Sequence, residues 1–124
     1  MQKFLLIVRE DLTQLKQSGP EERNNRILQM MTWVESLAES GNYQGGEALL
    51  IDGKYVSRDK IVSDGPFIEA KEGVSGYMLL QAENLEQAAS IAQTCPIVLQ
   101  DKMAIEIRPI MTVNHKSNNG SRSA

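Results

Sequence analysis

The sequence has 124 residues, of which 13 are basic and 16 acidic, so its formal net charge is −3. This length suits one domain, and the acidic balance argues against a nucleic-acid-binding protein, which needs a basic surface. The longest apolar runs, residues 4–8 and 48–51, are far shorter than the ~20 residues that cross a bilayer, and no signal peptide is recognisable. The single cysteine, Cys95, excludes an intrachain disulfide. We therefore expect a soluble, cytoplasmic, single-domain protein that binds neither membranes nor nucleic acid.

The first elements expected are a strand and a long helix. Residues 3–10 have the pattern of a strand covered on both faces, because apolar side chains point to both sides. A helix is expected to begin at Pro20, which suits the first helical position, and to end at Gly41. We expect Met30, Met31 and Trp33 to pack in the core rather than to form a binding surface. The apolar face of this helix consists of Ile27, Met30, Met31, Val34, Leu37 and Ala38.

The middle of the chain predicts further strands. Gly45-Gly46 opens a strand over residues 47–51, again apolar on both faces. Asp52-Gly53 is a strong hairpin signal, from which residues 54–57 would return. Residues 58–63 predict a second small strand or an excursion, and residues 77–81 a main strand.

The last elements expected are a short helix, a strand and a tail. Asn84 is a cap with Gln87 three residues later, and Cys95-Pro96 ends the helix. Alternating apolar and polar residues over 103–110 predict a strand with one wet face. The polar sequence that follows indicates a domain over residues 1–111 and a disordered tail over 112–124.

This order of elements predicts an α+β fold of the ferredoxin-like β-α-β-β-α-β type, with an inserted β-hairpin. In that fold both helices cover one face of an antiparallel sheet. Three of the four main strands expected here carry apolar residues on both faces, so the other face would form a larger exposed apolar patch than monomers tolerate. A second copy is the simplest cover, and we expect a homodimer packed sheet to sheet.

One motif combines turn residues with charges. Asp64, Gly65, Pro66 and Phe67 read as a turn in which Asp64 accepts hydrogen bonds from backbone amides and Phe67 is an apolar anchor. The motif continues with Glu69, Lys71 and Glu72, so that three carboxylates and one lysine lie within nine residues. Such a group could form a site with perturbed pKa values. The alternative, which composition alone favours, is a solvated charged loop between two strands.

Asp-Gly-Pro-Phe followed by Glu, by Lys-Glu and by Gly-Tyr resembles the signature of the YCII-related, or DGPF-domain, family. The N-terminal strand, Gly45-Gly46, the helix ending in Cys95-Pro96 and the closing Glu-x-Arg-Pro at 106–109 occur in the same order, so the resemblance covers about residues 1–111. It departs at Ser75, where a second glycine is common. The resemblance implies a dimeric α/β-barrel and a fold like that of muconolactone isomerases and small cofactor-independent monooxygenases.

The resemblance does not carry one activity with it. Some relatives have a His-Asp pair suggested as catalytic, but the one histidine here, His115, lies in the expected tail, so that mechanism is not transferable. Cys95 has no histidine to activate it and is expected to be a buried helix-end residue. Arg9 and Arg108 either hold an anionic ligand or pair with acidic neighbours, namely Glu47 or Glu106. The carboxylates lack a metal-loop spacing, so we expect no metal and no cofactor.

Two hypotheses on function follow. In the first, the protein is a homodimeric small-molecule-binding protein or enzyme with a pocket between sheet and helices, bordered by residues 64–72. In the second, it is a regulatory interaction module that works with an extracytoplasmic-function sigma factor, because other relatives occur alongside such factors, and it then needs an exposed patch for its partner. The candidate ligand-binding residues of the first are Asp64, Gly65, Pro66, Phe67, Glu69, Lys71, Glu72, Arg9 and Arg108.

Overall fold

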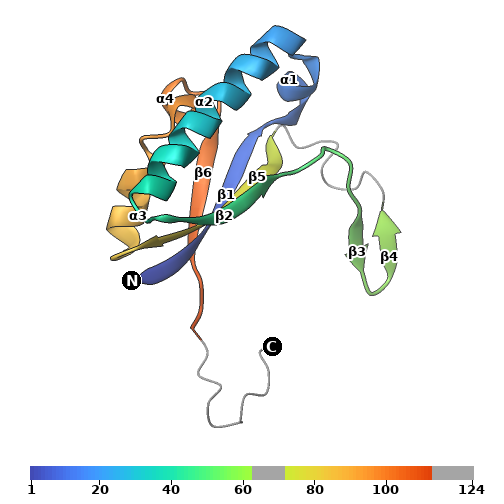
Figure 1. The fold of residues 1–124 in the computed structure, drawn as a ribbon. Coiled ribbons are helices and arrows are strands. Elements are labelled where there is room, and N and C mark those ends of the chain that lie inside the picture. Colours follow the sequence, from blue (N-terminus) through green and yellow to red (C-terminus); the bar gives the residue numbers. More distant parts are fainter. Residues whose placement is uncertain (63–71, 113–124) are drawn as a thin grey trace.

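A four-stranded antiparallel sheet, in the order β2-β5-β1-β6, is covered on one face by helices in the computed structural model (Figure 1). The structure describes residues 1–62 and 72–112, so most of the 64–72 motif and the expected tail, with His115, lie outside the described residues. The architecture is α+β and consistent with the expected ferredoxin-like fold, with a hairpin between the second and third main strands. In chain order, the elements are β1 Gln2–Asp11, α1 Leu12–Gln17, α2 Pro20–Glu39, β2 Tyr43–Ala48, β3 Tyr55–Ser57, β4 Lys60–Val62, β5 Glu72–Ala82, α3 Leu85–Ala92, α4 Pro96–Leu99 and β6 Ala104–Pro109.

The core lies between the helices and one face of the sheet. Along β1, buried residues alternate with partly exposed ones, and the buried Phe4 and Leu6 face Leu80 and Met78 of β5. The buried Ala88 and Ala92 allow α3 to lie close to the sheet. The side chain of Asn84 caps this helix, as predicted, by accepting a hydrogen bond from the Gln87 amide at 2.8 Å. No helix in the described part of the chain is long and apolar enough to span a membrane.

The buried face of α2 differs from the one that its sequence predicted. Trp33 and Leu37 are buried, which confirms the core role of Trp33. The core role expected of Met31 and Ile27 is wrong, because both are more than half exposed, and Ala38 is exposed as well. The helix turns Trp33 toward the core, and its edge with Ile27 and Met31 borders a cavity instead of packing on the sheet.

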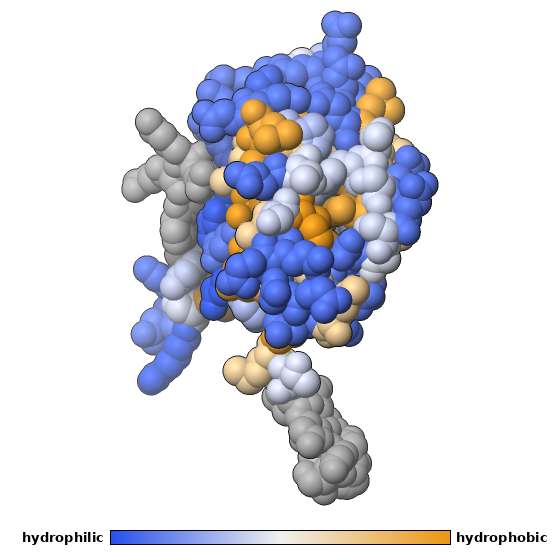
Figure 2. Space-filling view, turned by 90° about the vertical axis from the view of Figure 1, so that its left-hand side faces the viewer, coloured by the Kyte–Doolittle hydropathy of each residue, from blue (hydrophilic) through white to orange (hydrophobic). Residues whose placement is uncertain are grey.

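The surface is not uniformly polar. Figure 2 shows hydrophobic side chains gathered between hydrophilic regions on one face of the molecule. Over the whole described surface, large apolar residues that are more than half exposed include Ile27, Leu28, Met31, Leu50, Val56, Ile61 and Leu99. Two of these residues, Ile27 and Met31, border the cavity that is described below.

The second main strand, β2, begins and ends earlier than expected. The strand predicted over residues 47–51 is wrong beyond Ala48, because residues 49–51 are exposed and outside the sheet. Gly46 lies within the strand rather than before it. A Cβ there would lie 2.5 Å from the carbonyl oxygen of Tyr77 and 2.8 Å from Cα of Met78, so glycine is what lets β2 approach β5 this closely.

The predicted hairpin turn at Asp52-Gly53 is also wrong. β3 pairs with β4 so that Ser57 lies opposite Lys60, and the two residues between them make the turn. A two-residue type I′ turn needs positive φ at both central residues, whereas the described glycines with positive φ are Gly41 and Gly45. The small strand expected within residues 58–63 is β4.

We expect Gly46→Ala to lower the free energy of unfolding by about 1–3 kcal/mol, because the added methyl group meets backbone atoms that cannot move aside cheaply. Gly53→Ala is the matched control, since nothing lies within 4 Å of a Cβ built there. Urea denaturation should show a lower midpoint for Gly46→Ala only, with an unchanged slope. Equal midpoints for the two variants would contradict the close approach of β2 and β5.

Candidate functional site

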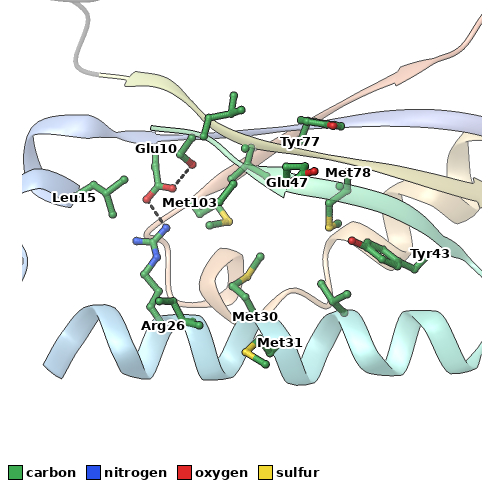
Figure 3. Close-up of a pocket in the computed structure, with 18 of the residues that line it drawn as sticks. Glu10, Leu15, Arg26, Met30, Met31, Tyr43, Glu47, Tyr77, Met78 and Met103 are labelled. Atoms are coloured by element: carbon green, nitrogen blue, oxygen red, sulfur yellow. Dashed lines mark hydrogen bonds and ion pairs between the residues drawn. The ribbon is translucent and has the colours of Figure 1, made fainter. Parts of the chain in front are cut away.

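A cavity of about 530 Å³ lies between α2 and the face of the sheet that α2 covers (Figure 3). α2 forms one wall, β2 and β5 form the opposite wall, and Glu10 of β1 and Leu15 of α1 lie at one end. This volume is within the range of pockets that bind small organic molecules. The lining is largely apolar and includes Val8, Leu15, Ile27, Met30, Met31, Val34, Tyr43, Gly46, Ala48, Leu49, Gly76, Tyr77, Met78 and Met103.

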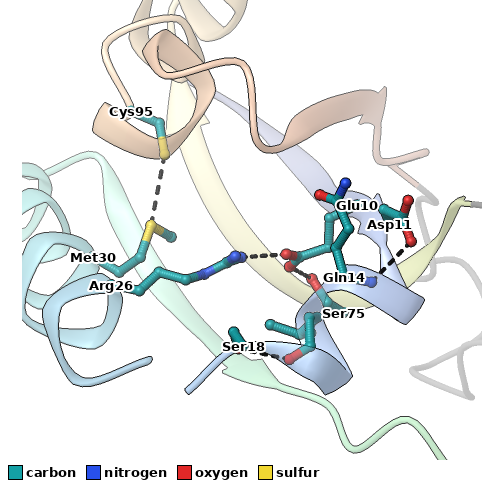
Figure 4. Close-up of polar contacts among 9 residues, drawn as sticks. Glu10, Asp11, Gln14, Ser18, Arg26, Met30, Ser75 and Cys95 are labelled. Atoms are coloured by element: carbon teal, nitrogen blue, oxygen red, sulfur yellow. Dashed lines mark hydrogen bonds and ion pairs between the residues drawn. The ribbon is translucent and has the colours of Figure 1, made fainter. Parts of the chain in front are cut away.

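Four methionines line this cavity, namely Met30, Met31, Met78 and Met103. Their unbranched, polarisable side chains adapt to the shape of a bound group more readily than branched ones do. The sulfur of Met30 also lies 3.6 Å from Sγ of Cys95 (Figure 4). Cys95 is fully buried, as expected, but the expected helix end at Cys95-Pro96 is wrong. α3 already ends at Ala92, and Pro96 begins α4, where its fixed φ suits the first helical position.

One polar cluster faces this apolar lining, formed by Glu10, Arg26 and Ser75 (Figures 3 and 4). Glu10 is only 5% exposed. One of its carboxylate oxygens accepts a hydrogen bond from the Arg26 guanidinium, and the other accepts one from the Ser75 hydroxyl. An unpaired carboxylate is costly to bury, so these two donors make its position under α2 possible.

A β-bulge brings Ser75 to Glu10. Val8 pairs with Gly76, but the next residue of β1, Arg9, pairs with Val74, so Ser75 is an extra residue on β5. A bulge redirects the side chain at the irregular position. Here it lets Ser75 point to the same face of the sheet as Glu10, where its hydroxyl reaches the carboxylate.

The helix α1 closes the cavity end and was not anticipated from the sequence. It begins directly after β1, and the side chain of Asp11 caps it by accepting a hydrogen bond from the Gln14 amide at 3.1 Å (Figure 4). This helix places Leu15 in the cavity lining. The signal was present, because Asp is a preferred cap and the residues that follow it are mostly good helix formers.

Arg9 and Arg108 lie on the opposite face of the sheet and are absent from the cavity lining. The Arg9 Nε is 2.9 Å from one carboxylate oxygen of Glu106, and the Arg108 Nη1 is 3.6 Å from the other. Of the two acidic partners considered for them, the structure therefore selects Glu106. All three side chains are at least a third exposed, so these ion pairs add little to stability.

Of the other predicted site residues, only Glu72 is among the described ones. It begins β5, and its backbone pairs with Asp11, next to Glu10. The motif therefore joins the sheet at the end of the cavity that holds the polar cluster. The residues outside the described part are Asp64, Gly65, Pro66, Phe67, Glu69 and Lys71.

Comparisons with known proteins agree on the family and the fold. A family model described as YCII-related domain matches residues 2–114. A solved structure of similar fold is that of 5-chloro-2-hydroxyhydroquinone dehydrochlorinase from Burkholderia phenoliruptrix AC1100, in complex with 2,5-dihydroxybenzoquinone. The two chains are 15% identical with a TM-score of 0.56, over 95% of this chain and 99% of that one, so the likeness concerns the fold. No curated protein matches the sequence significantly.

We expect Arg26→Met to lower the free energy of unfolding by about 3 kcal/mol, because it leaves the Glu10 carboxylate buried without a counter-charge. Adding Glu10→Gln should recover part of this loss, since a neutral amide replaces the uncompensated charge and still accepts from Ser75. Arg23→Met, at an exposed position of the same helix, is the control and should change stability by less than about 0.5 kcal/mol.

Chemical denaturation of the single and double variants gives the coupling free energy between the two side chains. If the losses from Glu10→Gln and Arg26→Met simply add, the two residues do not stabilise the fold as a pair.

Proposed function

The chain belongs to the YCII-related domain family, and we propose that it is a small-molecule-binding protein whose ligand occupies the cavity between α2 and the sheet. The observation that carries this proposal is an apolar cavity of about 530 Å³ with one polar cluster at its end. An apolar pocket with a few converging polar groups is the usual form of a small-molecule site. The sigma-factor hypothesis stays a prediction that no feature of the described residues tests.

The lining defines the class of ligand. A molecule with a compact apolar body would lie among the methionines, with an oxygen-bearing group directed toward Glu10, Arg26 and Ser75. Arg26 has further N–H donors beside the one that binds Glu10, and the Ser75 oxygen is also an acceptor, so a hydroxyl or carbonyl group fits this end. The 2,5-dihydroxybenzoquinone in the dehydrochlorinase of similar fold is an example of this class of ligand.

Proton transfer to or from a ligand would fall on Glu10. It is the buried carboxylate of the lining, whereas Glu35 and Glu47, which also line the cavity, are exposed. The contacts from Arg26 and Ser75 fix the carboxylate in place, as proton exchange with a bound molecule requires. Turnover of the ligand would therefore depend on Glu10.

Two neighbouring residues of α2 allow a matched test of the cavity. Ile27 lines it and Leu28 does not, although both are more than half exposed. In a thermal-shift screen of small hydroxylated ring compounds, including 2,5-dihydroxybenzoquinone, we expect a binder to raise the melting temperature of the wild type. Ile27→Trp should abolish this shift by filling the cavity, and Leu28→Trp should retain it. A compound that stabilises both variants equally binds elsewhere, and that result would contradict the proposal.

We also infer that two copies pack through the open face of the sheet, as a dimeric α/β-barrel. On this face Leu5 and Ile7 of β1 lie opposite Leu79 and Tyr77 of β5, and all four are only partly buried in the single chain. Residues 49–51, which were expected to extend this apolar face along β2, lie outside the sheet. The apolar strip therefore consists of side chains from the two central strands, β1 and β5. An uncovered strip of this kind favours association, and a second copy related by a two-fold axis would cover it.

Sedimentation velocity tests this dimer. We expect the wild type to be a dimer at micromolar concentration and Ile7→Lys to raise the dissociation constant by at least about 100-fold, because it places a charge in the interface. Leu28→Lys, on the exposed side of α2, should leave the dimer intact. A well-folded wild-type monomer at about 10 μM would contradict sheet-to-sheet packing.

A further inference from the structure

A second polar group faces the cavity from the end opposite Glu10. Tyr43, the first residue of β2, belongs to the cavity lining and is half-buried. Figure 3 shows its hydroxyl directed into the space between α2 and the sheet. The backbone carbonyl of Tyr43 accepts a hydrogen bond from the Gln44 side chain at 3.2 Å, whereas its hydroxyl has no hydrogen-bond partner among the described residues. This hydroxyl, which both donates and accepts, is therefore available to a bound molecule.

A β-bulge turns Tyr43 to this face of the sheet. The pairing with β5 shifts between Tyr43 and Gly45, so Gln44 is an extra residue on β2. In a regular strand, the first and fourth residues point to opposite faces. The extra residue instead places Tyr43 on the same face as Gly46, which is the face that α2 covers. Ser75 owes its position to the bulge on β5, so the polar groups at both ends of the cavity depend on a bulge.

The turn before β2 holds Tyr43 in place. The Asn42 amide donates a hydrogen bond to the Leu37 carbonyl at 3.0 Å, and the Asn42 side chain donates one to the Gln81 carbonyl at 2.8 Å. The Gln81 amide donates in turn to the Asn42 carbonyl at 2.8 Å. The residue directly before Tyr43 is thus attached to both α2 and the sheet. A ring held in this way loses little freedom when a ligand binds, which favours affinity.

The spacing between the two polar groups suits one ring. Tyr43 pairs with Leu80, and Ser75 lies five residues before Leu80 on β5. Five residues of a strand span at most about 17 Å. The Tyr43 side chain takes up part of this length, and a hydrogen bond of about 2.8 Å at each end of the ligand takes up more. The room that remains suits a six-membered ring with oxygen atoms on opposite carbon atoms.

We propose that Tyr43 binds a second oxygen group of the ligand, so that the cavity selects rings with two oxygen groups at opposite positions. One group contacts the cluster of Glu10, Arg26 and Ser75, the other forms a hydrogen bond with the Tyr43 hydroxyl, and the methionines contact the ring between them. This inference rests on the proposed function, to which it adds the residue that decides between ring compounds. A ring with a methyl group in place of the second oxygen leaves the hydroxyl against an apolar group and binds less tightly.

Equilibrium titration with two ring compounds of the same shape tests this role. 1,4-Dihydroxybenzene carries the second oxygen, and 4-methylphenol has a methyl group in its place. We expect the wild type to bind 1,4-dihydroxybenzene at least about fivefold more tightly than 4-methylphenol. Tyr43→Phe should lower this ratio to about 1 and leave the affinity for 4-methylphenol within about twofold of the wild type. Tyr55→Phe, on β3 and outside the lining, is the control and should keep the ratio.

Two further measurements separate recognition from a structural role. Tyr43→Phe should leave the melting temperature of the ligand-free protein unchanged, because the hydroxyl that it removes has no partner in the described part of the chain. 1,3-Dihydroxybenzene, whose oxygens are not opposite, should bind no more tightly than 4-methylphenol. If it binds as tightly as the 1,4 isomer, the arrangement at opposite ends is wrong and the inference is overturned.

Equal affinities of the wild type for 1,4-dihydroxybenzene and 4-methylphenol would also overturn the inference, as would an unchanged ratio in Tyr43→Phe. A wild type that binds neither compound overturns it as well. The proposed function fails on a different result, namely that Ile27→Trp abolishes the binding of no compound in the thermal-shift screen.

Discussion

A carboxylate buried beneath a helix needs a counter-charge, and this requirement ties α2 to β1. Arg26 reaches from the first half of α2 to Glu10, and its length spans the space between the helix and the sheet (Figure 3). Farther along, Trp33 and Leu37 attach the helix through buried apolar contacts. Because the first attachment is a long polar side chain and not close apolar packing, the helix and the sheet are held apart there, and the cavity occupies the space that remains.

The wall of the cavity that β2 and β5 form keeps this space open because two of its residues are glycines. A Cβ at Gly46 would lie 2.5 Å from the carbonyl oxygen of Tyr77 and one at Gly76 would lie 3.1 Å from that of Glu47, and neither glycine has a side chain that could fill the cavity. The glycines that allow the strands to pair therefore also leave room beneath α2. Ser75 comes directly before Gly76, at the position where the sequence departs from the second glycine common in the resembling family. A glycine there would lack the hydroxyl that binds Glu10, so this part of the polar cluster is specific to a serine.

The sequence predicted those elements that depend on interactions between residues close together in the chain. The start of α2 at Pro20, the cap at Asn84 and the N-terminal strand β1 all follow from short-range preferences, and the structure confirms them. The cavity could not be predicted in this way, since Glu10 and Arg26 lie 16 residues apart and no spacing rule joins a strand end to a helix. The turn at Asp52-Gly53 failed for a different reason. The hairpin turns between Ser57 and Lys60, where the sequence is Arg58-Asp59 and has no glycine to mark a tight turn.

The proposed ligand site and the proposed dimer contact use opposite faces of the same strands. Side chains alternate between the two faces of a strand. On β1, Leu5 and Ile7 point to the open face, whereas Val8 and Glu10 line the cavity on the face that α2 covers. One strand can therefore serve both contacts, because no side chain has to take part in the two at once.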